Sequence, residues 1–143
     1  NEDDSKQSPD GMDLAILVFD YQKMEVQYSG ANNPLLCVKN NEIKRTRADK
    51  MPIGSSDYMS KSFTSHRLSF VKGDVFYIFS DGYVDQFGGP NDKKFMSKRF
   101  RELLLQVSNL PLNKQKEILD HTIEEWRGDE FQIDDILVIG IKA

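Results

Sequence analysis

Carboxylates stand at the ends of two apolar runs that are far apart in the chain. The run Val75–Phe79 leads directly into Ser80-Asp81-Gly82, and the run 136–141 follows Asp134-Asp135. Carboxylates that crowd together repel one another and lose hydration, so such a cluster is tolerated mainly where a cation neutralises it. Hard divalent cations prefer carboxylate oxygens. These residues therefore predict a metal site if the fold brings them together.

The two runs have the composition of strands that can bring these acids together. Both are short, rich in β-branched or aromatic residues and bounded by turn formers, which is typical of strands buried on both faces. If they are antiparallel neighbours, the C-terminal end of the first lies beside the N-terminal end of the second. Asp81 and Asp134 then meet at one edge of a sheet.

Other residues are weaker candidates for chemistry. Asp10 and Asp13 precede a third apolar run and can reach the same edge or an accessory metal, although a loop role is favoured. Asp85 is more often a solvated residue at a helix start than a ligand. His66 and His121 have no second His or Cys at ligand spacing, so both are expected to be structural or exposed. Lys93 and Lys94 either face a phosphorylated protein or lie in a solvated loop.

The remaining pattern predicts about seven strands and two helices. Hairpins are expected through 21–23 and 39–41, with Ile43 facing inward, and 62–70 is expected to pair with the central strand through the turn 72–74. Ser97 is expected to cap a helix with an apolar face, and Pro111 to start a second helix that ends near Gly128. The inward positions of the helices are Phe100, Leu103, Leu104, Val107, Leu112, Leu119, Ile123 and Trp126.

These elements favour an α+β fold of stacked, mostly antiparallel β-sheets (a β-sandwich) flanked by helices. The connections between the early strands are too short for the crossovers of a parallel sheet. No glycine-rich phosphate loop precedes a helix in the context that a dinucleotide-binding fold requires.

Composition limits the class of protein. The 143 residues correspond to one domain, with residues 1–10 as a polar tail or loop. The net charge of −4 gives no basic field for nucleic acid, and no run approaches the length of a membrane span. Cys37 has no partner for a disulfide and is expected to be a small core residue, which fits a cytoplasmic location. A longer parent protein can still be membrane-anchored through upstream segments.

The motifs together resemble one family. Lys72-Gly73-Asp74, the following strand, Ser80-Asp81-Gly82 and Asp134-Asp135-Ile136 occur in the order found in metal-dependent protein phosphatases of the type 2C (PPM) superfamily, in their bacterial SpoIIE-like branch. The segments 29–35, 51–54 and 85–95 resemble further motifs of that branch. The resemblance runs from about residue 10 to residue 142.

This resemblance implies a β-sandwich in which aspartates bind two Mn²⁺ or Mg²⁺ ions and activate a water that attacks phosphoserine or phosphothreonine. It implies that Asp81 and Asp134 are metal ligands, and that Gly82 lets the backbone turn close to the site. Asp135 is expected to hydrogen-bond around the ligands rather than to bind metal.

The sequence departs from the family at its start. The opening motif D-x-x-G-H-G, which supplies an aspartate that bridges both metals, is absent. We therefore expect residues 11–143 to be the C-terminal portion of one SpoIIE-like domain and to be inactive alone. The missing N-terminal portion is expected to pack on it, so that the chain exposes apolar surface and can pair with itself as a homodimer.

The leading hypothesis is a protein serine/threonine phosphatase that acts as the output domain of a bacterial sensor or response regulator. Its substrate would be a phosphoprotein such as an anti-anti-sigma-like regulator. The alternative is a non-catalytic, partner-binding module with a degenerate phosphatase fold. A third interpretation is a module in which a cation serves stability alone.

Overall fold

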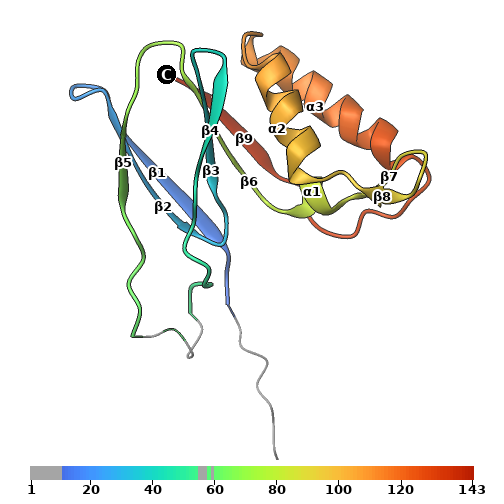
Figure 1. Ribbon diagram of the computed structural model, residues 1–143, viewed down its shortest axis with the longest axis horizontal. Helices are drawn as coiled ribbons and strands as arrows, with labels where there is room; N and C mark the ends of the chain where they lie inside the picture. The colour runs from blue at the N-terminus through green and yellow to red at the C-terminus, as the bar shows by residue number, and fades with distance from the viewer. Residues whose placement is uncertain (1–10, 55–57, 59) are drawn as a thin grey trace, which may run out of the picture.

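The computed structural model describes residues 11–54, 58 and 60–143. The predicted polar tail at 1–10, including Asp10, lies outside the described residues. The described residues form two larger sheets, a small two-stranded sheet and helices, in the mixed architecture that the sequence predicts. Figure 1 shows the helices on one side of the molecule and the three-stranded sheet on the other.

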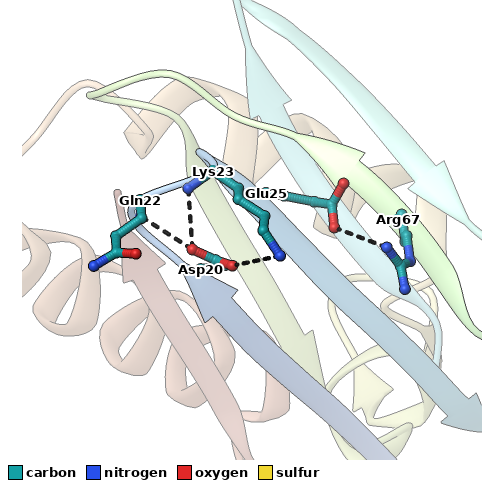
Figure 2. Close-up of polar contacts among 5 residues, drawn as sticks. All are labelled: Asp20, Gln22, Lys23, Glu25 and Arg67. Carbon is teal, nitrogen blue, oxygen red and sulfur yellow. Dashed lines mark hydrogen bonds and ion pairs between the residues drawn. The ribbon is translucent and has the colours of Figure 1, made fainter.

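The three-stranded sheet has the order β1-β2-β5, from β1 (Leu14–Asp20), β2 (Glu25–Ala31) and β5 (His66–Ser69). The predicted hairpin between β1 and β2 is confirmed. Its turn is organised by Asp20, whose Oδ1 accepts hydrogen bonds from the backbone N–H groups of Gln22 and Lys23, both at 3.0 Å (Figure 2). Beyond the turn, Glu25 and Arg67 form an ion pair at 3.6 Å between β2 and β5.

The four-stranded sheet has the order β4-β3-β6-β9. Its strands are β3 (Leu35–Lys39), β4 (Glu42–Thr46), β6 (Val75–Phe79) and β9 (Val138–Lys142). All three strand pairings in this sheet are antiparallel, and the predicted hairpin of β3 and β4 is confirmed. The central strand β6 therefore joins the middle of the chain to its C-terminal strand.

The helical segment begins directly after β6. It comprises α1 (Gly82–Asp85), the short strands β7 (Phe87–Gly88) and β8 (Lys93–Lys94), then α2 (Ser97–Val107) and α3 (Leu112–Arg127). Phe100, Leu104 and Val107 of α2 are buried, as the periodicity predicts. Two predicted details are wrong: Ser97 is the first helical residue and makes no capping bond, and Leu112 is 39% exposed.

Two apolar clusters hold the layers together. One lies between the four-stranded sheet and the helices and includes Tyr77, Phe100 and Leu119. The other lies between the two sheets and includes Tyr28 and Phe76. Because β6 sends alternate side chains into both clusters, it is buried on both faces, as predicted.

The predicted pairing of residues 62–70 with the central strand is wrong. β5 pairs with β2, so the chain changes sheets at 70–74. The buried Asp74 stabilises this crossing, because its Oδ2 accepts a hydrogen bond from Val71 N at 2.9 Å and lies 3.5 Å from Lys39 Nζ. The polar turn at 72–74, which has the composition of a hairpin turn, instead connects the three-stranded sheet to the four-stranded sheet.

The predicted full burial of the run 136–141 is also wrong, and the run that follows Asp13 is not fully buried either. β1 and β9 are edge strands, and Ile16, Val18, Leu137 and Ile139 are all more than 40% exposed. β9 begins at Val138, two residues later than the apolar run suggested. Ile16 and Val18 alternate along β1 with side chains that pack between the sheets, so they lie on the outer face of the three-stranded sheet. An apolar run is therefore not proof of burial on both faces.

Candidate metal centre

The pairing of β6 with β9 brings the two predicted ligands to the same end of one sheet. Phe79 pairs with Val138, and Ser80 N continues the ladder with a 3.0 Å hydrogen bond to Leu137 O. Asp81 follows β6 and Asp134 precedes β9, so both lie just beyond this end. In Figure 1 the end of β6, α1 and the segment entering β9 lie together.

The electrostatics of Asp81 agree with this placement. Partial burial, followed by the negative charges of Asp134, Asp85 and Asp13, raises the pKa of the Asp81 carboxyl above its ordinary value. A neighbouring anion has this effect only within a short range. Nearby negative charges therefore disfavour the charged form of Asp81, and a cation at this position would relieve that repulsion.

Ser80 couples the two strands at this point. Its Oγ donates a hydrogen bond to Asp135 O at 2.7 Å and accepts one from Leu137 N at 3.0 Å. Asp135 N in turn donates to Asp134 Oδ1 at 2.7 Å. Ser80 stands in the Ser80-Asp81-Gly82 motif, but its bridging role was not predicted from the sequence. The signal in the sequence that could have indicated this role is a serine placed between a buried strand and an aspartate.

Gly82 lies against the same segment. A Cβ at this position would lie 2.2 Å from Asp135 O and 2.8 Å from its carbonyl carbon. Only a residue without a side chain lets α1 approach the 134–136 segment this closely. Gly82 therefore sets the separation between the two halves of the candidate site.

The weaker candidates have partners of their own. Asp85 forms a 3.0 Å ion pair with Lys94, and Asp13 Oδ1 accepts a 2.7 Å hydrogen bond from Asn32 Nδ2. Asp135 contributes its backbone carbonyl and N–H to the contacts described above. By contrast, Asp81 and Asp134 make no ion pair within the described residues.

The donor set fits part of a site for hard divalent cations. Asp81 and Asp134 supply exposed carboxylates of the required type, and one of them has a raised pKa caused in part by the other. In the described part of the chain, no group of three or more His, Cys, Asp or Glu side chains is arranged to hold a metal. A complete centre would therefore need ligands besides these two.

Without metal, Asp81 is expected to destabilise the native state at neutral pH. Its pKa is higher in the folded than in the unfolded state, so the unfolded state binds fewer protons between the two values and stability falls as pH rises. Asp81→Asn should therefore raise the melting temperature at pH 7 in EDTA, and the difference should shrink as pH falls through the two pKa values.

Thermal denaturation from pH 4 to pH 8 would test this, with the exposed Asp92→Asn as the control. Added Mn²⁺ should stabilise the wild type more than Asp81→Asn. A lower melting temperature for Asp81→Asn in EDTA at pH 7 would contradict the expectation.

Comparisons with solved structures agree with this architecture. The SiaA-PP2C domain of Pseudomonas aeruginosa matches with a TM-score of 0.85 and 25% identity over 92% of this chain and 51% of that one. The Mn-presoaked phosphatase domain of SpoIIE from Bacillus subtilis matches with a TM-score of 0.64 and 13% sequence identity, over 91% of this chain and 56% of that one. RsbX in complex with magnesium matches with a TM-score of 0.60 and 15% sequence identity, over 91% of this chain and 55% of that one. The chain thus spans about half the length of these structures.

The fold is that of a PP2C-type phosphatase domain. The sequence profile described as Stage II sporulation protein E (SpoIIE) matches residues 3–143, so the chain belongs to the SpoIIE family. No curated protein matches it in a sequence search. Among the described helices, none has the length and apolar character needed to cross a membrane.

Proposed function

We propose that this chain forms part of a metal-dependent protein phosphatase that hydrolyses phosphoserine or phosphothreonine in a regulatory protein. The observation that carries the proposal is the antiparallel pairing of β6 with β9, which brings Asp81 and Asp134 to one sheet end. The SpoIIE family match and the metals named with two matched structures support it.

In this proposal Asp81 and Asp134 hold Mn²⁺ or Mg²⁺. Divalent metal at such a site lowers the pKa of a bound water and offsets the charge of phosphoryl oxygens. Ser80 keeps the 134–137 segment against the end of β6 through its two hydrogen bonds. Gly82 allows that segment to approach α1, and Asp135 orients Asp134 through its backbone N–H.

We further propose that residues 11–143 are one portion of a SpoIIE-like domain whose other portion supplies the remaining ligands. The domain would act in the cytoplasm as the output of a signalling protein. A phosphorylated anti-anti-sigma-like regulator is the proposed substrate, by analogy with the family.

The test is phosphate release by the native protein that contains this chain. With a phosphoserine protein as substrate, release should require Mn²⁺, stop in EDTA and return when Mn²⁺ is restored in excess. Release that is unchanged by EDTA would reject a metal-dependent mechanism. Tight binding of the phosphoprotein without any phosphate release would favour the non-catalytic binding module instead.

A further inference from the structure

A pocket of about 230 Å³ opens beside Asp81, between the four-stranded sheet and the start of α2. Leu36, Phe79 and Phe100 supply apolar walls, and Arg45 of β4 and Arg101 of α2 supply positive charge. Neither arginine has a role that could be predicted from the sequence, because they are 56 residues apart and neither belongs to a recognised motif. The fold places both of them at one opening.

The two guanidinium groups are available to a ligand. Neither Arg45 nor Arg101 forms an ion pair or a side-chain hydrogen bond donated to another group in the ranges that the structure describes. Arg45 is exposed and Arg101 is half-buried. Arginine presents a planar fork of N–H donors that matches phosphate and carboxylate oxygens, so two of them at one pocket favour an anion.

The other polar groups of the pocket narrow the choice of anion. Asp13 also lines it, but its Oδ1 already accepts a hydrogen bond from Asn32. Asp81 carries the opposite charge and is the proposed metal ligand. A phosphoryl group has three non-bridging oxygens, so it can bind guanidinium groups with some while others face a metal at Asp81. A carboxylate has only two oxygens, so it is less able to bind the guanidinium groups and a metal at Asp81 at the same time.

The start of α2 adds to this preference. Ser97, the first residue of this 11-residue helix, lines the pocket together with Phe100 and Arg101. The N-terminal turn of a helix has unpaired N–H groups and a partial positive charge, both of which favour an anion. The N-terminal turn of α2 and the two arginines therefore all favour the binding of an anion in this pocket.

We propose that Arg45 and Arg101 bind the phosphoryl group of the substrate in this pocket and position it beside Asp81. This inference rests on the proposed phosphatase function and adds to it the residues that recognise the phosphoryl group. It also predicts that inorganic phosphate, the reaction product, binds at the same place.

The first test measures binding of inorganic phosphate to the native protein in EDTA by titration calorimetry or NMR. Arg45→Ala and Arg101→Ala should each weaken binding about tenfold, as expected for the loss of a charge-assisted hydrogen bond. Arg45→Lys and Arg101→Lys keep the charge without the fork and should lie between alanine and wild type. Arg67→Ala is the control, because Arg67 pairs with Glu25 on the other sheet (Figure 2).

The second test compares two substrates with Mn²⁺ present. If the arginines bind the phosphoryl group, kcat/KM should fall by the same factor for p-nitrophenyl phosphate and for a phosphoprotein. A fall for the phosphoprotein alone would overturn the inference, since the arginines would then bind an acidic side chain of the substrate.

The two proposals can fail separately. Mn²⁺-dependent phosphate release with wild-type phosphate binding in both alanine variants would reject this inference and leave the phosphatase function standing. Arginine-dependent phosphate binding in a protein without phosphatase activity would reject the proposed function and support the anion pocket.

Discussion

Replacing Asp81 by asparagine is expected to lower Mn²⁺-dependent phosphate release by the native protein at least about 100-fold. Changes to groups that only orient a metal ligand cost about 10- to 100-fold, and Asp81 is proposed to bind the metal itself. Asparagine keeps the size and one oxygen of the side chain but removes the charge that a hard cation prefers. The measurement is kcat/KM at saturating Mn²⁺, together with the Mn²⁺ dissociation constant.

Two further variants make this result interpretable. Asp92→Asn removes an exposed carboxylate in the turn between β7 and β8 and should leave activity unchanged. Asp85→Asn breaks the ion pair with Lys94 and should have a smaller effect than Asp81→Asn. Undiminished turnover in Asp81→Asn would reject the assignment of Asp81 as a metal ligand.

The parts of the fold that the sequence predicted are those set by local pattern. Val75–Phe79 has the composition of a buried strand, and the hairpins at 21–23 and 39–41 have short polar turns between apolar runs. The apolar spacing in α2 and α3 matches the helix period. The antiparallel pairing of β6 with β9 could be stated only as a condition, because it joins segments that are far apart in the chain, and the structure shows that pairing.

The parts that the sequence did not predict depend on contacts between distant segments. The turn at 72–74 has the composition of a hairpin turn, but only the tertiary contacts of Asp74 show that it joins two layers. Ile16 is exposed because it lies on the outer face of the three-stranded sheet, and Ile139 is exposed on the edge strand β9. An apolar run encodes neither of these positions.

In the candidate site, too, some residues could be predicted from the sequence, and other features could be found only in the structure. Asp81, Gly82 and Asp134 stand in recognisable motifs, whereas the bridge from Ser80 to the 135–137 segment and the pocket shared by Arg45 and Arg101 require the folded chain. Motif residues can be found one at a time because each carries a local signal. Their supporting contacts join elements of different sequence position, and those contacts set the geometry on which metal and phosphate binding depend.

Replacing Gly82 by alanine is expected to damage this geometry more than any change at the weaker acidic candidates. The new Cβ would meet Asp135 O at 2.2 Å, and the obstacle is backbone, which cannot rotate away as a side chain can. We expect a loss of about 1–3 kcal/mol of stability from overpacking. We also expect Mn²⁺ affinity and turnover to fall about 100-fold, because a displacement near 1 Å is enough to misalign reacting groups.

Two comparisons separate this local effect from a general loss of stability. Ser80→Ala removes the hydroxyl that bridges Asp135 and Leu137, and it should cost about 1–2 kcal/mol and weaken Mn²⁺ binding about tenfold. Gly73→Ala adds a Cβ at φ +98° with no atom within 4 Å, so its cost of about 1 kcal/mol is backbone strain far from the site. Mn²⁺ affinity should therefore fall in Gly82→Ala and Ser80→Ala but not in Gly73→Ala. If folded Gly82→Ala binds Mn²⁺ as the wild type does, the 134–136 segment does not carry a ligand of this metal.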